Sequence, residues 1–342
     1  MGFAKREVNL AVIARKLGIS ISTVSRALRG ASSIHPTTRE RVLEEAQALG
    51  YLDSHRVSGT TNRTKNILVL SQAQQLDSDS VYMAGLSQAA VSFKVSLISH
   101  HYMPENCNRI LDPKSQPMAM KSGDACGVVL LHRWPETVVR ELSASMPVVS
   151  IIHYYRGVDF VGIEDRKGMY DLVAHLVANG RSRIGFFGFC PLMSVSRSRF
   201  SAYVEALAAH GLPFQSEDLI EVSLEEASSL ALTDPLPMSK VAVARTKSGV
   251  TAWICSNQML GYSLFRNLQK EGFKIPSDVS LSGFHGNAHA QPVGLPLLTT
   301  TAVSSEELGV AALRRLIFRI DRPEESCRSI LFPCSLQEGE SS

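Results

Sequence analysis

The chain contains 342 residues, of which 44% are hydrophobic and 20% are charged, and it carries a formal net charge of +3. This length is too great for one ordinary domain, and a mean hydropathy of +0.03 allows a sizeable core and argues against a wholly disordered chain. The sequence contains no run of about 18 apolar residues and no secretory signal at its start, so we expect a cytoplasmic protein with no membrane partner.

The charge is unevenly distributed. Residues 1–65 contain 11 Lys and Arg against 5 Asp and Glu, a net charge of +6, which leaves −3 for the remainder. A basic head favours a polyanionic partner such as nucleic acid. The six cysteines lack any C-x-x-C spacing, which argues against a zinc ribbon, a redox pair or a disulfide framework. We expect no metal and no cofactor.

Three short helices are predicted in the first fifty residues. Asn9 is a candidate cap for a first helix, whose apolar residues recur at helical spacing over residues 10–17. After a turn at residues 18–19, Ser20 can cap a second helix that runs from residue 21 to about residue 29. The third begins with Pro36 at its first position and ends at Gly50. Three such helices can enclose a miniature core.

The second helix has two unlike faces. Val24 and Leu28 form an apolar side that can pack, whereas Ser22, Ser25 and Arg26 recur at helical spacing on the other side. Small hydroxyl groups can approach phosphate closely, and arginine can pair in bidentate fashion with a guanine edge. The second helix is therefore a candidate for reading the DNA major groove.

The stretch N-L-A-V-I-A-R-K-L-G-I-S-I-S-T-V-S-R-A-L-R-G (residues 9–30), followed by T-R-E-R-V-L-E-E-A-Q-A-L-G-Y (38–51), resembles the head of the lactose-repressor family of bacterial transcription regulators. The resemblance implies a helix-turn-helix head over residues 1–52. It implies base contacts from Ile21, Ser22 and Arg26. It implies contacts to the DNA backbone from Ser20, Thr23, Ser25, Arg29, His35 and Thr38. One head reads only a few base pairs, so a homodimer on a palindromic operator is expected.

The linker over residues 53–65 departs from this family. Its members place there a short hinge helix with a leucine that wedges into the minor groove, whereas this chain has Gly59 and Thr60. Glycine and threonine make a poor helix. Val57 is the one candidate wedge, and a flexible linker without a wedge is the alternative. We expect DNA to be kinked less than is usual for the family.

From Lys65 onward, apolar runs alternate with amphipathic stretches, which predicts an α/β fold with doubly wound parallel sheets. The predicted strands are residues 66–70, 95–99, 127–131, 148–152, 183–188, 252–255 and 279–283. The predicted helices are residues 81–93, 167–179, 199–210, 258–271 and 306–320.

This part again resembles the lactose-repressor family, through G-V-D-F-V-G-I-E-D-R-K-G (157–168), H-L-V-A-N-G-R-S-R-I-G-F-F-G (175–188), I-P-S-D-V-S-L-S-G-F (275–284) and L-L-T-T-T-A-V-S-S-E-E-L-G (297–309). The resemblance implies two Rossmann-like lobes of the periplasmic-binding-protein type. The N-terminal lobe would comprise residues 66–161 and about 289–320. The C-terminal lobe would comprise residues 162–288 and about 321–336.

Small ligands bind such folds at the carboxyl ends of the strands, in the cleft between the lobes. The candidate effector residues at strand ends are Ser71, Gln72, His132, His153, Ser256, Asn257 and His285. Arg199 opens the helix predicted after the fifth strand. It matches the arginine with which family members hold a ligand oxygen or carboxylate.

The identity of the effector stays open. Sugar-binding family members place aspartate where this chain has Ile152 or His153 and again where it has His285, and carboxylates grip vicinal hydroxyls. A neutral sugar is therefore disfavoured, and a sugar derivative or an anionic metabolite is expected. Alternatively, the histidines have no ligand role, or they bind a metal, although no pair has a short ligand spacing such as H-x-x-x-H.

The sequence thus predicts a DNA-binding transcription regulator, a repressor, whose operator affinity responds to a small molecule bound between two lobes. One alternative is an α/β enzyme that uses the strand-end histidines as acid–base groups, although no nucleophile elbow, phosphate loop or dinucleotide fingerprint is found. The other is a regulator with no small-molecule effector. We expect no catalytic residues.

Overall fold

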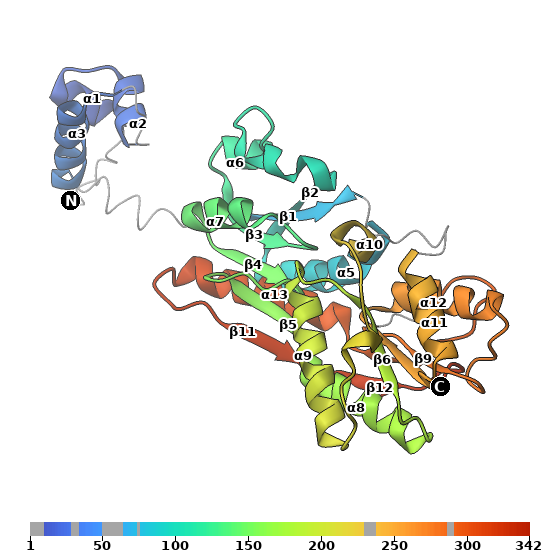
Figure 1. Cartoon of the computed structure of the whole chain (residues 1–342). Coiled ribbons are helices and arrows are strands. Elements are labelled where there is room, and N and C mark those ends of the chain that lie inside the picture. Colours follow the sequence, from blue (N-terminus) through green and yellow to red (C-terminus); the bar gives the residue numbers. More distant parts are fainter. Residues whose placement is uncertain (1–9, 29–33, 50–63, 74–75, 229–236, 286–290) are drawn as a thin grey trace. The chain divides into compact units, whose positions relative to one another are not determined.

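The computed structural model describes the whole chain except residues 1–9, 29–33, 50–63, 74–75, 229–236 and 286–290 (Figure 1). The chain divides into two compact units, Met1–Thr64 and Lys65–Ser342. Each unit has a hydrophobic core of its own.

The first unit consists of three helices: α1 (Leu10–Leu17), α2 (Ile21–Leu28) and α3 (Pro36–Ala48). Each helix contributes fully buried side chains to one small core, among them Ile13, Val24 and Val42. Gly18 has a φ of +67°, a left-handed conformation that glycine adopts without steric cost, and it turns the chain between α1 and α2. The three predicted helices are confirmed.

The second unit contains a six-stranded parallel sheet in the order β11-β5-β4-β3-β1-β2 (Figure 1). Its strands are β1 (Lys65–Gln72), β2 (Val95–Tyr102), β3 (Ala125–Leu130), β4 (Val148–Ile151), β5 (Asp159–Ile163) and β11 (Ser329–Phe332). Both faces of the inner strands are buried, which gives them near-continuous apolar sequence.

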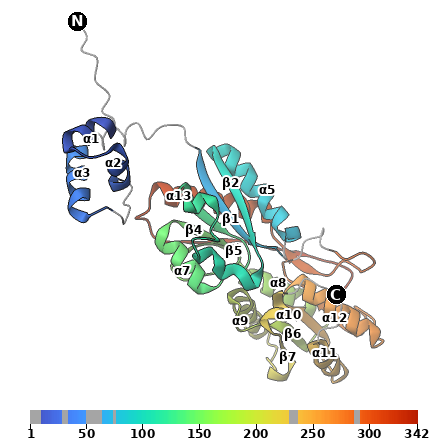
Figure 2. The ribbon, with the colours of Figure 1, turned by 90° about the horizontal axis from the view of Figure 1, so that it is seen from above.

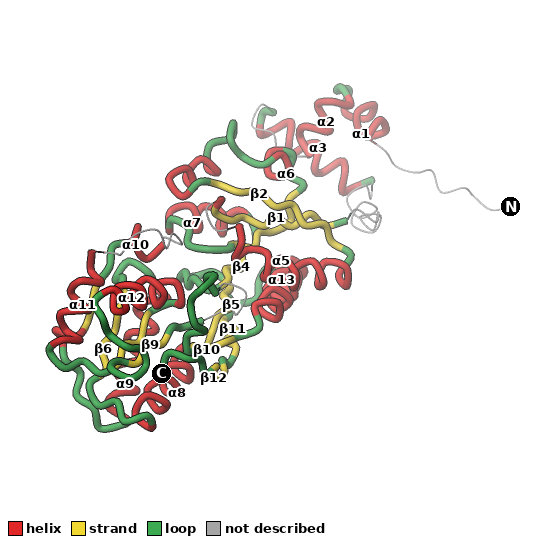
Figure 3. The backbone as a smooth tube through the Cα atoms, turned by 90° about the vertical axis from the view of Figure 1, so that its right-hand side faces the viewer, coloured by secondary structure: helices red, strands yellow, loops and turns green. Residues whose placement is uncertain are grey.

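Helices cover the two faces of this sheet. One face packs against α5 (Leu76–Phe93) and α13 (Ser305–Asp321), which lie side by side (Figure 3). The other face packs against α7 (Glu136–Ser145), the 3-10 helix η2 (Pro104–Leu111) and the short α6 (Met118–Lys121). The sheet and these helices form the first lobe.

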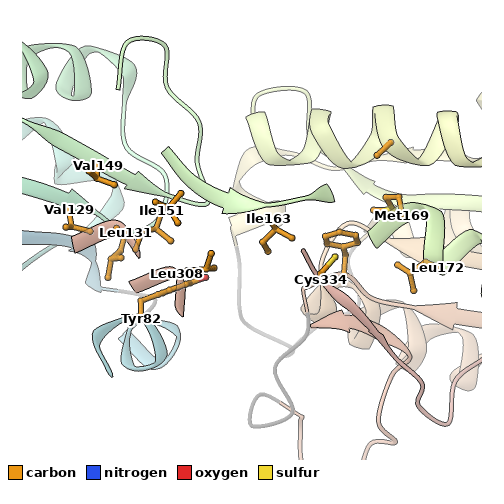
Figure 4. Packing of buried hydrophobic residues seen from close by; sticks show 14 of the residues in the cluster. Tyr82, Val129, Leu131, Val149, Ile151, Ile163, Met169, Leu172, Leu308 and Cys334 are labelled. Carbon is orange, nitrogen blue, oxygen red and sulfur yellow. The ribbon is translucent and has the colours of Figure 1, made fainter. Parts of the chain in front are cut away.

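The second lobe is built on a four-stranded parallel sheet in the order β7-β6-β8-β9. Its strands are β6 (Ile184–Phe189), β7 (Leu219–Glu221), β8 (Ala252–Cys255) and β9 (Ser280–Ser282). Its helices are α8 (Asp165–Ala178), α9 (Ser194–Ala209), η3 (Ser216–Asp218), α10 (Leu224–Ser228), α11 (Pro237–Lys247) and α12 (Gln258–Lys270). One cluster of buried hydrophobic side chains extends through both lobes, and Ile163 lies between its two parts (Figure 4).

The end of the chain returns to both lobes. After α13, strand β11 pairs with β5 at the edge of the six-stranded sheet. An antiparallel ribbon then joins β12 (Ser335–Gln337) to β10 (Thr300–Ala302). Ser341 is fully buried, and its hydroxyl donates to the Leu281 carbonyl, so the C-terminus lies against the second lobe (Figure 2).

The predicted fold class is confirmed, since all seven predicted strands and five predicted core helices are present with ends shifted by a few residues. Three positions differ. Leu298 belongs to the buried cluster of the second lobe and Thr299 pairs with Ser282, so the chain crosses back to the first lobe after residue 299, later than the expected residue 288. Helix α9 begins at Ser194, so Arg199 lies in its second turn and does not open it. Residues 329–332 belong to the first lobe through the β11–β5 pairing, so the last crossing comes after Phe332, later than the expected residue 321.

Candidate functional site

The start of α2 is organised by hydroxyl groups. The Ser20 hydroxyl oxygen accepts a hydrogen bond from the Thr23 backbone N–H at 3.1 Å, as a helix cap does. The same oxygen lies 2.8 Å from the Ser22 hydroxyl and 2.8 Å from the Thr23 hydroxyl. The predicted cap is confirmed, and the beginning of the helix is held by its own side chains.

The remaining residues predicted to contact DNA lie on the first unit as follows. Ile21, Ser22 and Arg26 are exposed on α2, and Arg26 Nε donates to the Ser22 carbonyl at 3.4 Å. His35 is exposed just before α3, with its Nδ1 atom 2.8 Å from the Thr37 hydroxyl, and Thr38 is half-buried. The side chain of Ser25, together with Arg29 and Val57, lies outside the described residues.

In the second unit, Arg199 occupies a central position. Its guanidinium is nearly fully buried and has three partners from separate elements. Nε donates to the Asp165 carboxylate at 3.2 Å, Nη1 donates to the Ser256 carbonyl at 2.6 Å, and the charge lies 4.4 Å from the centre of the Phe284 ring. Arg199 thus joins the starts of α8 and α9 to the ends of β8 and β9.

The charge of Arg199 acts on two histidines, the buried His153 and the half-buried His285. The pKa of His153 is lowered to about 3, chiefly by burial and then by the charges of His132, Arg199 and Arg133. Burial and the charge of Arg199 lower the pKa of His285 to about 3 as well. Both imidazoles are therefore neutral at pH 7, where each offers one donor and one acceptor nitrogen.

Three of the other predicted effector residues are engaged within the protein. The Ser71 hydroxyl lies 2.5 Å from His101 Nδ1, and Gln72 Nε2 donates to the Arg133 carbonyl at 2.5 Å. The Asn257 side chain caps α12 by accepting from the Leu260 N–H at 2.8 Å. Capping gives Asn257 a structural role that the sequence position alone does not reveal.

A cavity of about 420 Å³ opens between the lobes. Ile152, Tyr154, Phe160 and Leu331 line it from the first lobe. The starts of α8 and α9 line it from the second lobe with Glu164, Asp165, Arg166, Ser194, Ser198, Arg197 and Arg199. Arg199 alone among the eight predicted effector residues lines this cavity, and the other seven do not.

The charges of this cavity are mostly paired. Arg166 is bonded to Glu205, and Arg199 is bonded to Asp165. Arg197 Nη1 donates to the Pro191 carbonyl at 2.6 Å, and among the described residues Arg197 forms no ion pair. Sequence reasoning missed Asp165 and Arg197, although each lies two residues before a predicted helix start.

Two features are absent from the described residues. These residues contain no group of three or more His, Cys, Asp or Glu side chains that could hold a metal ion. They contain no helix long and apolar enough to cross a membrane.

The two units match two known families. Residues 9–54 match the bacterial regulatory proteins of the lacI family, and residues 173–342 match a periplasmic binding protein-like domain. A helix-turn-helix unit followed by such a two-lobed unit defines a class of ligand-responsive regulators. The chain belongs to the lacI family of bacterial regulatory proteins.

Two named relatives are similar in sequence to this chain over nearly its whole length. The chain is 25% identical over 319 residues to the HTH-type transcriptional repressor PurR of Mannheimia succiniciproducens, with 90% of each chain covered. It is 27% identical over 337 residues to the HTH-type transcriptional regulator AglR of Rhizobium meliloti, covering 93% of this chain and 90% of AglR.

Solved structures share the fold. A complex of the transcriptional regulator CelR with cellobiose superposes with a TM-score of 0.68 at 21% identity, over 98% of this chain and 100% of CelR. The lac repressor dimer bound to operator and the anti-inducer ONPF superposes with a TM-score of 0.65 at 18% identity, over 98% of this chain and 99% of the repressor.

Proposed function

We propose that this protein is a transcriptional repressor that binds a palindromic operator as a homodimer through α2. The observation that carries this proposal is the exposed face of α2, where Ser22 and Arg26 lie opposite the buried Val24. In a helix-turn-helix unit the second helix enters the major groove, and arginine and hydroxyl side chains contact base edges and phosphates there. The family match over residues 9–54 supports it.

Selection of bound sites from random duplex DNA by the full-length protein tests the proposal. We expect the selected sites to share a palindromic sequence, because two identical heads related by a two-fold axis read the same bases. A gel-shift titration then measures the affinity for the selected site and for a scrambled site of equal composition. If the folded protein enriches no sequence, the proposal is wrong.

We further propose that a small acidic molecule binds in the interlobe cavity and changes operator affinity. Aliphatic and aromatic side chains line one side of this 420 Å³ space, and Arg197 and Arg199 line the other. Arg197 bonds to a backbone carbonyl, so its charge is available to an acidic group of a ligand. An apolar wall with a few convergent polar groups is usual for small-molecule sites.

Calorimetric titration separates this ligand class from neutral sugars. We expect a sugar phosphate or a sugar acid to bind and the matching neutral sugar to bind at least tenfold more weakly. Arg197→Gln should abolish that difference, whereas Arg140→Gln, at an exposed position on α7 away from the cavity, should preserve it. If the wild-type protein binds the neutral sugar as tightly as the acidic one, an acidic effector is excluded.

The alternative of an enzyme has less support. A general acid or base works best with a pKa near the operating pH, and His153 and His285 have pKa values of about 3. The relatives compared above are named as transcription regulators. Regulation is therefore the function that the site supports best.

A further inference from the structure

One apolar side chain interrupts the polar face of α2. Ile21, the first residue of the helix, is 51% exposed, whereas Val12 and Leu43, the other large exposed hydrophobic residues described in this unit, are 38% and 37% exposed. A single exposed isoleucine on a surface is ordinary. This one lies at the end of the helix that a helix-turn-helix unit directs at base edges, which gives its position a specific consequence.

The surroundings of Ile21 fix it in place. The Ser20 hydroxyl lies 2.8 Å from the Ser22 hydroxyl and 2.8 Å from the Thr23 hydroxyl, and it also caps the helix. These hydrogen bonds therefore hold the backbone turn that carries Ile21 before the protein binds DNA. A β-branched side chain in a helix also has one strongly preferred χ1 rotamer. Little conformational entropy is lost when this side chain contacts a partner.

Among the groups that DNA exposes in the major groove, one is apolar and can match the isoleucine side chain. The edges of the groove present hydrogen-bond donors and acceptors, and its apolar group is the C5-methyl of thymine. An isoleucine placed against any donor or acceptor would leave that group without a partner, which is costly. We infer that Ile21 contacts a thymine methyl group and thereby specifies thymine at one position of each operator half-site. This inference rests on the proposed DNA binding by α2.

Replacing thymine by uracil tests the inference, because it removes the methyl group and leaves base pairing unchanged. The selected operator is synthesised with uracil at each thymine position in turn, symmetrically in both half-sites, and the affinity of the full-length protein is measured. At one position we expect a loss of about fourfold per half-site, or about 15-fold for both, because burial of one CH₂-sized group is worth ~0.8 kcal/mol.

Two variants assign that loss to Ile21. Ile21→Ala should bind thymine and uracil operators equally, within about twofold, because alanine lacks the longer aliphatic chain that would extend to the thymine methyl. Alanine is the best helix former and the site is exposed, so this variant should fold, which circular dichroism checks. Leu43→Ala removes a similarly exposed aliphatic side chain from α3 and should retain the wild-type preference for thymine.

The outcomes are distinct. The inference is overturned if no uracil substitution weakens binding, or if the loss persists unchanged in Ile21→Ala. Failure to select any bound sequence would instead overturn the proposed function. An operator without thymine in the half-sites would also refute the inference directly.

Discussion

Three residues at strand ends of the second unit hold left-handed backbone conformations: His132, Ile152 and His285, with φ values of 62°, 68° and 52°. Glycine would adopt these conformations freely, whereas other residues do so at a cost of about 1–3 kcal/mol. They follow β3, β4 and β9; Ile152 lines the cavity, and the charge of Arg199 acts on His285. Strain retained at such a place supports a binding role for this edge.

The buried histidines predict loss of stability in acid. An unfolded histidine takes up a proton near pH 6.5, whereas folded His153 does so only near pH 3. Between these values the unfolded state binds more protons, so the free energy of unfolding decreases as pH falls, by up to ~1.4 kcal/mol per pH unit for each such histidine.

Urea unfolding from pH 7 to pH 4 measures this dependence. We expect His153→Gln to have a shallower decrease in stability with falling pH than the wild type. His210→Gln, at a half-buried position just after α9, serves as the comparison variant for loss of a histidine elsewhere in the second lobe. Equal slopes in all three proteins would mean that His153 is accessible to protons in the folded state.

At the scale of elements, the packing of α5 against α13 depends on two glycines. A Cβ atom at Gly85 would overlap the backbone carbonyl of Glu306, and one at Gly309 would overlap the backbone carbonyl of Tyr82. The two helices therefore approach with backbone against backbone. The obstruction is main chain and cannot rotate away.

We expect Gly85→Ala to lower the free energy of unfolding by about 1–3 kcal/mol, the usual cost of overpacking, although alanine has the higher helix propensity. Gln88→Ala, at an exposed position one turn later in α5, should change stability by less than about 0.5 kcal/mol. Thermal unfolding of the two variants compares them, and an unchanged Gly85→Ala midpoint would show that the helices can separate at little cost.

The elements also show what sequence can and cannot predict. The three helices of the head were predicted from the sequence motif, and the long buried strands were predicted from continuous apolar runs. Strand β11 was missed because its residues are partly exposed and it has a partner, β5, far away in the sequence. The short β5 and the helices α7 and α11 were also missed, and α7 was missed although its buried residues Val138, Val139 and Leu142 recur at helical spacing.

The candidate site also has features that the sequence could predict and features that it could not. Ser20 was predicted to cap α2 because capping depends on neighbours in the sequence. The partners of Arg199 could not be predicted, since Asp165, Ser256 and Phe284 come from elements that only the tertiary fold brings together. The cavity lining was missed for the same reason.

At the scale of the whole molecule, charge is concentrated in residues 1–65, with a net charge of +6, against −3 for the rest. Affinity for DNA should therefore fall steeply with salt, since each neutralised phosphate contributes a slope of about −0.9 in log affinity against log salt. We expect the selected operator and random duplex DNA both to lose affinity between 50 and 200 mM salt.

The comparison of the two duplexes makes this prediction specific. Phosphate contacts are common to both, so their loss lowers both affinities, whereas base contacts keep the operator preferred at every salt concentration. Fluorescence anisotropy at several salt concentrations gives both slopes. Salt-independent binding to random DNA would mean that the basic head does not neutralise phosphates.

The return of α13 and β11 to the first lobe has a consequence for synthesis. The three helices of the head make local contacts, so the head can fold soon after it leaves the ribosome. The six-stranded sheet lacks its edge strand until Phe332 has been made, and the face covered by α13 stays open until residue 321. The DNA-reading head can thus fold while the first lobe, still without α13 and β11, exposes apolar surface.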